Sequence, residues 1–119
     1  MRCSVLVVDD DTAFRGLAAR MLAGWGHVVV GEAGTVSEAM LRAAQLRPDA
    51  ALVDVGLPDG DGFALARRLV ALPWALSVVL VSIDADRAGV RAAERAGARG
   101  FLPKDELPCQ QLRHLLEGR

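Results

Sequence analysis

The sequence predicts an α/β fold: a doubly wound, three-layer (βα)5 sandwich around a five-stranded parallel sheet. Five short apolar runs alternate with five amphipathic helical segments over 119 residues. The runs are apolar throughout, which is typical of parallel strands covered by helices on both faces. Crossovers between parallel strands are right-handed, so successive helices can cover both faces of one sheet. The length suits a single domain, which we expect to span residues 1–119 with no output domain.

The first two β–α units show clear boundaries. Residues 3–8 form a β-branched run that stops at three aspartates, and the third of these, Asp11, is a residue type favoured at helix N-caps. The helix that follows has apolar residues at positions i, i+3, i+4, i+7 and i+8: Phe14, Leu17, Ala18, Met21 and Leu22. Two glycines then end it. Residues 27–33 form the second strand, and Thr35 caps a second helix that a proline stops.

The remaining three units follow the same rules. Residues 49–55 form the third strand, followed by the turn-forming loop GLPDGDG and a helix that runs up to Pro73. Residues 77–83 form the fourth strand, which is followed by a helix over residues 85–96. Residues 98–103 form a short fifth strand. The last helix packs four apolar residues inward: Cys109, Leu112, Leu115 and Leu116.

Composition and charge exclude several classes of protein. Hydrophobic residues make up 52% of the chain and the net charge is −1, so there is no basic field for direct nucleic-acid binding. No apolar stretch is as long as a membrane span, and the first residues run into acids instead of a cleavage site. We therefore expect a cytoplasmic protein with no membrane contact, in which Cys3 and Cys109 stay reduced. His27 and His114 lack metal-ligand spacing and are expected at the surface.

Polar side chains stand at the ends of four predicted strands. The first strand ends in Asp9 and Asp10, the third in Asp54 and the fourth in Ser82, and Lys104 follows the fifth. In a doubly wound sheet, ligands bind beyond the carboxyl ends of the strands. Lys104 is also the only lysine among fourteen basic residues, the others being arginines. A compact ammonium there indicates a small pocket that holds a small anion.

The chemistry of these groups favours a metal-assisted phosphoryl site. A half-buried charge at Asp54 is costly unless something binds it. Three neighbouring carboxylates repel one another, and Mg²⁺ prefers oxygen ligands while keeping some of its waters. Lys104 would neutralise phosphoryl oxygens opposite the metal, and Ser82 would donate a hydrogen bond to another.

These residues lie in motifs that resemble a known family over the whole chain. VVDDD, DVGLPDGDG, VVLVS and GARGFLPK occur here in the order and spacing of a receiver domain of a bacterial two-component response regulator. The resemblance implies the flavodoxin-like strand order 2-1-3-4-5. It implies that Asp54 accepts a phosphoryl group from a sensor histidine kinase or a phosphotransfer protein. It also implies that Mg²⁺ is held by Asp9, Asp10, Asp54 and the backbone carbonyl of Gly56.

The resemblance further implies a conformational switch. Ser82 and Lys104 would bind the phosphoryl oxygens, and Phe101 occupies the switch-aromatic position of the family. Drawing Ser82 toward the phosphoryl group would vacate space for the Phe101 ring and bias a two-state equilibrium. Such a domain catalyses its own phosphorylation and slow dephosphorylation, and is not a turnover enzyme.

Two positions depart from the family pattern. Most members have proline directly after the lysine, whereas here Asp105 follows Lys104 and Pro103 precedes it. This resembles NarL/LuxR-type receivers, which carry a DNA-binding output domain, or stand-alone receivers that act on a downstream protein. It puts in doubt any dimer built on the fourth helix, fifth strand and fifth helix, while a phosphorylation-dependent homodimer stays open. Ile83 is larger than the usual residue beside the hydroxyl and would narrow access to Asp54.

Three other functions fit the sequence less well. A phosphatase of the haloacid dehalogenase class needs a second aspartate two residues after the first, where this chain has Gly56. A flavin carrier is disfavoured because aromatic residues are only 4% and tyrosine is absent. A degenerate receiver that serves as a phosphorylation-independent interaction module stays open because of Ile83, although all five strand-end residues argue against it.

Overall fold

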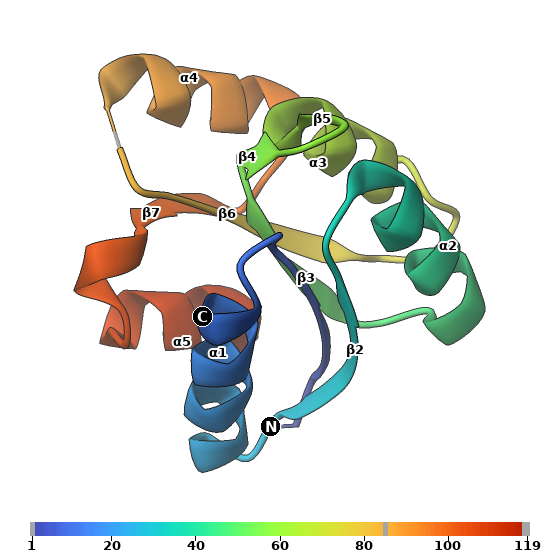
Figure 1. The fold of residues 1–119 in the computed structure, drawn as a ribbon, viewed down its shortest axis with the longest axis vertical. Helices are drawn as coiled ribbons and strands as arrows, with labels where there is room; N and C mark the ends of the chain where they lie inside the picture. Colours follow the sequence, from blue (N-terminus) through green and yellow to red (C-terminus); the bar gives the residue numbers. More distant parts are fainter. Residues whose placement is uncertain (1, 85, 118–119) are drawn as a thin grey trace.

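The computed structural model describes residues 2–84 and 86–117, and its core is a parallel sheet between two layers of helices (Figure 1). The sheet strands are β1 (Ser4–Val8), β2 (Val28–Ala33), β3 (Ala50–Asp54), β6 (Ser77–Ser82) and β7 (Gly100–Pro103). Their order is β2-β1-β3-β6-β7, and all four neighbouring pairs are parallel. Counted along the chain, this is 2-1-3-4-5, so the predicted fold class and strand order are confirmed.

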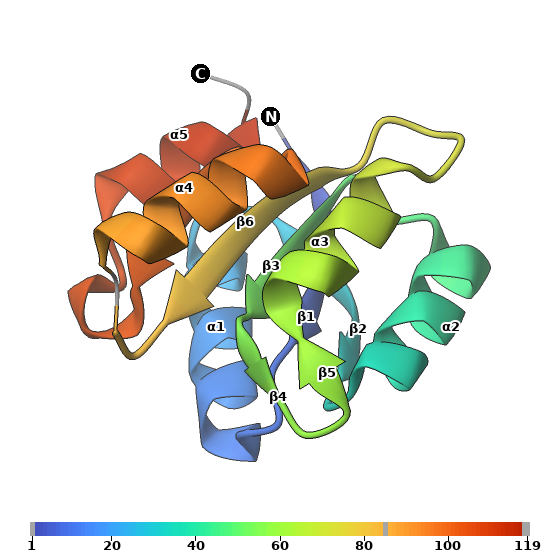
Figure 2. The same ribbon diagram turned by 90° about the horizontal axis from the view of Figure 1, so that it is seen from above.

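Helices cover both faces of the sheet, as Figures 1 and 2 show. Helices α1 (Thr12–Gly24) and α5 (Gln110–Glu117) lie on one face. Helices α2 (Val36–Leu46), α3 (Gly62–Val70) and α4 (Arg87–Ala96) lie on the other. A 3-10 turn, η1 (Lys104–Glu106), joins β7 to the segment before α5. No helix within the described ranges has both the length and the apolar character needed to cross a membrane.

The sheet separates two hydrophobic cores because successive strand residues point to opposite faces. In β1, Val5 and Val7 pack with α1 and α5, whereas Leu6 and Val8 pack with the other three helices. All four side chains are fully buried. A strand buried on both faces has no polar position along its length, which is the physical origin of the unbroken apolar runs in the sequence.

The loop after β3 contains a structure that the sequence did not predict. Strands β4 (Gly56–Leu57) and β5 (Gly60–Asp61) pair as a small antiparallel hairpin in the segment that was expected to be an irregular loop. Asp61 then caps α3 by accepting a hydrogen bond from the N–H of Ala64 at 2.7 Å. The turn formers were recognised correctly, but a two-pair ladder is too short to leave an alternating pattern in the sequence.

Helix N-caps lie where the sequence placed them for α1 and α2. The carboxylate of Asp11 accepts from the N–H of Ala13 at 2.9 Å, and the hydroxyl of Thr35 accepts from the N–H of Glu38 at 3.0 Å. Helix α4 begins at Arg87, two residues later than expected, because Asp86 caps it through the N–H of Gly89. Residue 85, the expected first residue, lies outside the described residues.

The expectation that His27 lies at the surface was wrong. Its ring is buried, and its Nδ1 accepts a hydrogen bond from the backbone N–H of Cys3 at 3.0 Å. The Nε2 atom lies 2.9 Å from the carboxylate of Glu117, to which it therefore donates. The Cys3 thiol donates to the carbonyl of Leu116 at 3.3 Å, so this cluster joins the start of β1 to the end of α5. His114 is exposed, as expected.

Replacing His27 should therefore destabilise the fold without touching the chemistry at the other edge of the sheet. We expect His27→Ala to lower the free energy of unfolding by about 1–3 kcal/mol, because buried polar partners lose their hydrogen bonds. Urea denaturation measures this change. The matched control is His114→Ala, which should change stability by less than about 0.5 kcal/mol. Equal effects of the two substitutions would contradict the role of the buried ring.

Candidate functional site

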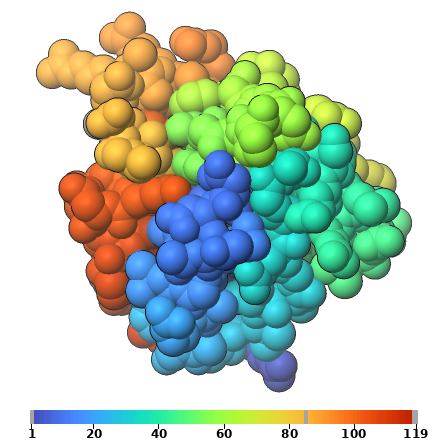
Figure 3. Space-filling view, viewed as in Figure 1, coloured from blue at the N-terminus to red at the C-terminus, as the bar shows by residue number. Residues whose placement is uncertain are grey.

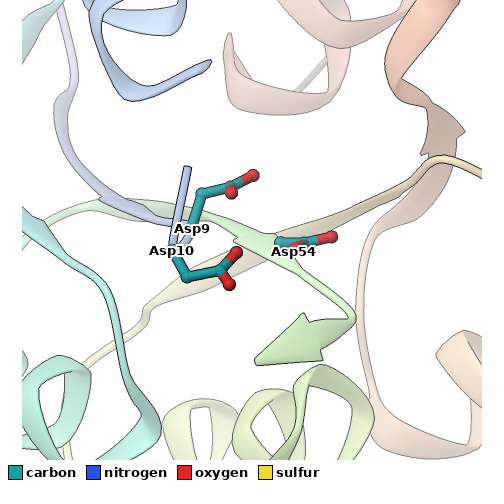
Figure 4. A group of neighbouring side chains, drawn as sticks. All are labelled: Asp9, Asp10 and Asp54. Carbon is teal, nitrogen blue, oxygen red and sulfur yellow. The ribbon is translucent and has the colours of Figure 1, made fainter. Parts of the chain in front are cut away.

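The strand-end residues that the sequence singled out meet at the carboxyl edge of the sheet. Asp9 and Asp10 follow β1, and Asp54 is the last residue of β3. Each of the three offers a carboxylate oxygen, and these oxygens lie within 4.8 Å of one another. Figure 4 shows the three side chains extending in the same direction from the ends of the two strands. In Figure 3, the blue, green and orange segments that carry the site residues adjoin one another on the face shown.

Asp9 is the most deeply placed of these acids, with no exposed surface. Its Oδ1 accepts a hydrogen bond from the N–H of Asp11 at 2.9 Å. Its Oδ2 forms an ion pair with Lys104 Nζ at 2.5 Å but has no properly directed hydrogen bond within the described part of the chain. A buried carboxylate oxygen with lone pairs to spare fits a metal ligand, because such atoms are otherwise satisfied.

Arg15 stabilises the loop that carries Asp9. The guanidinium of Arg15 donates to the backbone carbonyl of Asp9 at 2.6 Å and to Glu32 in β2 at 2.9 Å. This contact links α1, the end of β1 and β2. Sequence reasoning did not find Arg15, although an arginine six residues after a buried aspartate is within reach of the same turn.

Asp54 has an unusual protonation equilibrium. Burial raises the pKa of its carboxyl above the usual range, and the charge of Asp9 raises it further. The charge of Lys104 and a hydrogen bond from the backbone N–H of Gly56 act in the opposite direction. The charge of Asp10 also raises the pKa, and the three raising effects outweigh the two lowering ones.

Lys104 lies between two carboxylates and an aromatic ring. Its ammonium is 3.6 Å from Asp54 Oδ2 as well as 2.5 Å from Asp9. It also lies 4.5 Å from the centre of the Phe14 ring, a favourable cation–π distance. Phe14 was expected only as a core residue of the first helix. Phe14 lies in the first turn of α1, three residues after the acidic run, and this position is the signal that could have indicated its contact with Lys104.

Ser82 and Ile83 border the cavity above the acids. This cavity has a volume of about 260 Å³, and its lining consists of Asp10, Asp11, Asp54, Val55, Gly56, Ser82, Ile83, Asp84 and Lys104. The hydroxyl of Ser82 is buried and accepts a hydrogen bond from the N–H of Asp84 at 3.2 Å. Ile83 is 79% exposed and therefore lies at the mouth of the cavity, not in the core.

Phe101 lies on the other side of Ser82, beside a second cavity of about 350 Å³ that both residues line. The Phe101 ring is half-buried, with its centre 5.9 Å from the centre of the Phe63 ring. It also packs against α4 at Gly89, where a Cβ atom would lie only 2.6 Å from two ring carbons. Ser82 lines both the acidic cavity and the cavity beside the aromatic ring, together with Val55 and Asp84.

Comparison with known proteins identifies the family. The model of the response regulator receiver domain matches residues 5–117. The chain belongs to this family. The transcriptional activator DevR/DosR of Mycobacterium tuberculosis is 44% identical over 101 residues, which cover 84% of this chain and 46% of that protein. The chain therefore spans less than half of the length of this relative.

Solved receiver structures agree with the fold. The signal receiver domain of NarL from Mycobacterium tuberculosis superimposes with a TM-score of 0.89 at 32% identity, covering 99% of this chain and 98% of that one. A response regulator from Burkholderia pseudomallei, solved with a phosphorylated aspartic acid, calcium ion and citrate, gives a TM-score of 0.82 at 26% identity. That match covers 95% of this chain and 65% of the other.

Membership of the family establishes the general role of the chain. Receiver domains are the phosphoacceptors of two-component systems in bacteria, and as a class they are not turnover enzymes. They bind a divalent metal at an acidic cluster such as the one formed here by Asp9, Asp10 and Asp54. No finding favours the degenerate, phosphorylation-independent alternative.

The raised pKa of Asp54 predicts how stability depends on pH in metal-free buffer. The folded chain binds this proton more tightly than the unfolded chain, so the ionised carboxylate costs stability above its folded pKa. That cost disappears as the pH falls through the folded pKa toward the ordinary value of 3.8. We expect Asp54→Asn to raise the urea midpoint at pH 7 in the presence of a chelator, with a gain that shrinks on acidification.

Exposed Asp11 provides the control for this measurement. Asp11→Asn keeps the helix cap and should not raise the midpoint, because its side chain is exposed. A loss of stability in Asp54→Asn at pH 7 would contradict the unfavourable charge balance at the site.

Proposed function

We propose that Asp54 is the residue that accepts the phosphoryl group, from a sensor histidine kinase or a phosphotransfer protein. The observation that carries this proposal is the position of Asp54 within 4.8 Å of two further carboxylates, with the ammonium of Lys104 3.6 Å from its own carboxylate. Phosphoryl transfer has a loose transition state with charge spread over three oxygens. Positioning and positive charge therefore stabilise it effectively.

We further propose that the metal is Mg²⁺, held by Asp9, Asp10, Asp54 and the backbone carbonyl of Gly56. The donor set consists of oxygen atoms, which suits a hard divalent cation. Buried Asp9 Oδ2 supports this assignment, because it has no directed hydrogen bond among the described residues. Bound there, Mg²⁺ would supply positive charge that stabilises the phosphoryl oxygens together with Lys104.

The side chains at the site have separate roles in phosphoryl transfer. A carboxylate oxygen of Asp54 forms the new bond to phosphorus while the bond from phosphorus to the donor nitrogen breaks, and the donor imidazole leaves. No general base is required, because positioning and positive charge suffice for this loose transition state. Lys104 and the Ser82 hydroxyl hold the transferred oxygens. Ile83 controls access, since it lies at the mouth of the cavity.

The same arrangement supports a switch that involves Ser82 and Phe101. The Ser82 hydroxyl borders both cavities, so movement toward a phosphoryl group on Asp54 enlarges the space beside the aromatic ring. Phosphorylation thereby favours one of two existing arrangements. We propose that this change controls a DNA-binding output domain or a downstream protein in the cytoplasm, or a phosphorylation-dependent homodimer. We propose neither direct nucleic-acid binding nor membrane binding by this chain.

Phosphorylation by acetyl phosphate tests the assignment. Asp54→Asn should abolish labelling, because the amide is not a nucleophile. Asp10→Asn should lower the affinity for Mg²⁺ and the rate of labelling together, because it removes one of the three carboxylates that hold a strongly hydrated cation. Labelling is measured with and without Mg²⁺.

Asp11 again provides the matched control, since it lies next to Asp10 but caps α1. Asp11→Asn should leave both Mg²⁺ affinity and labelling nearly unchanged. Undiminished labelling of Asp54→Asn would refute the choice of acceptor, and equal losses from the Asp10 and Asp11 variants would refute the choice of metal ligands.

Ile83 should slow exchange at Asp54 in both directions. We expect Ile83→Ala to raise the rates of phosphorylation by acetyl phosphate and of autodephosphorylation by about threefold or more, equivalent to roughly 0.6 kcal/mol of activation free energy. Because the side chain is 79% exposed, stability should change by less than about 0.5 kcal/mol. Phosphorylation kinetics and urea denaturation of this variant test the gating role. Unchanged rates with a loss of about 2–5 kcal/mol in the free energy of unfolding would contradict it, because that is the result expected of a core isoleucine.

A further inference from the structure

The hairpin that follows Asp54 is attached at its tip to a helix that is distant in sequence. Asp59 lies between β4 and β5, and its carboxylate accepts from the backbone N–H groups of Val36 at 2.7 Å and Ser37 at 3.1 Å. It also accepts from the Ser37 hydroxyl at 3.2 Å. These hydrogen bonds lower the pKa of Asp59, and the bond from the Val36 N–H has the largest effect. The carboxylate is therefore ionised at neutral pH.

Helix α2 already has a cap of its own. The Thr35 hydroxyl accepts from the N–H of Glu38, and the Glu38 side chain accepts from the N–H of Gly34 at 2.8 Å. The first N–H groups of a helix have no partner within it, and Thr35 satisfies only one of them. Asp59 takes the two that Thr35 does not reach. Its contacts therefore do more than cap a helix, because they also join two segments across 22 and 23 residues.

The hairpin carries a peptide group that touches the phosphoacceptor. The backbone N–H of Gly56 donates to the Asp54 carboxylate, and Gly56 lines the acidic cavity. Gly56 pairs with Asp61 in a ladder of only two residue pairs. Isolated two-stranded ladders have little stability of their own. The position of the Gly56 peptide therefore depends on what holds the two ends of the hairpin.

The base and the tip of the hairpin are held differently. At the base, the N–H of Gly62 donates to the carbonyl of Val55 at 2.8 Å, and a Cβ on Gly62 would lie 2.4 Å from the Asp54 carbonyl oxygen. At the tip, Gly60 lies against Val36, where a Cβ would be 3.1 Å from that side chain. Asp59 supplies the polar attachment at this end.

We propose that Asp59 is a positioning residue for phosphorylation, acting through the Gly56 peptide. By fixing the hairpin tip to the first turn of α2, it fixes where the Gly56 N–H and carbonyl lie relative to Asp54. This inference rests on the proposed function of Asp54 and extends it to a residue that does not touch the phosphoryl group or the metal. The sequence indicated only a turn former at this position.

A pair of cap substitutions separates positioning from stability. Asp59→Ala and Thr35→Ala each remove one acceptor side chain from the first turn of α2, but only Asp59→Ala releases the hairpin. We expect Asp59→Ala to raise the Mg²⁺ concentration for half-maximal phosphorylation by acetyl phosphate by about tenfold or more, as for supporting residues around other metal sites. Thr35→Ala should leave it within about twofold, although both variants melt at lower temperature.

The Gly56 amide resonance in a ¹⁵N spectrum gives a second readout that needs no phosphoryl transfer. It should shift in Asp59→Ala and not in Thr35→Ala, and its response to added Mg²⁺ should require more metal in the former. Asp59→Asn, which keeps one acceptor oxygen, should restore part of the affinity. Equal Mg²⁺ requirements in Asp59→Ala and Thr35→Ala, or an unmoved Gly56 resonance, would overturn the proposal. Absence of labelling in the unmodified chain would count against Asp54 instead, while the Mg²⁺ titration would still decide the role of Asp59.

Discussion

The structure depends on an excess of negative charge at the carboxyl edge of a buried sheet. Asp9 directly follows one strand with hydrophobic cores on both faces and Asp54 ends another, and one ammonium lies between them at 2.5 and 3.6 Å. That ammonium cannot neutralise both carboxylates and Asp10 as well, so the site favours a cation or a proton. The surrounding contacts hold the acids together against their repulsion. Arg15 holds the carbonyl of Asp9, and the hairpin after Asp54 is fixed at both ends.

Space explains why this position uses the only lysine of the chain. The ammonium of Lys104 fits between the Asp9 carboxylate and the face of the Phe14 ring, with its side chain only 15% exposed. A guanidinium is wider and planar, and needs two acceptors side by side to satisfy its fork. A point charge can instead serve two carboxylates that face it from different strands. The thirteen arginines include surface and helix positions where that width is no obstacle.

The strand-end residues could be predicted because they obey local rules. An apolar run marks a strand, its last residue marks the carboxyl edge, and a parallel sheet brings those edges together, so Asp54 and Ser82 were placed from the sequence. The strand order came from family resemblance. His27 and Asp59 could not be placed, because the partners that determine them lie 90 and 22–23 residues away. Contacts between distant segments leave no periodic signal in the sequence.

The cluster of His27, Cys3 and Glu117 has a mechanical consequence. It fastens the start of β1 to the end of α5 at the edge of the sheet away from Asp54, about 17 Å along a five-residue strand. A polypeptide joined to the end of α5 would be tethered at this edge. Tension in such a tether would load the histidine cluster before it reached the acidic cavity. Such an attachment would therefore lie at the opposite end of β1 from the acidic cavity.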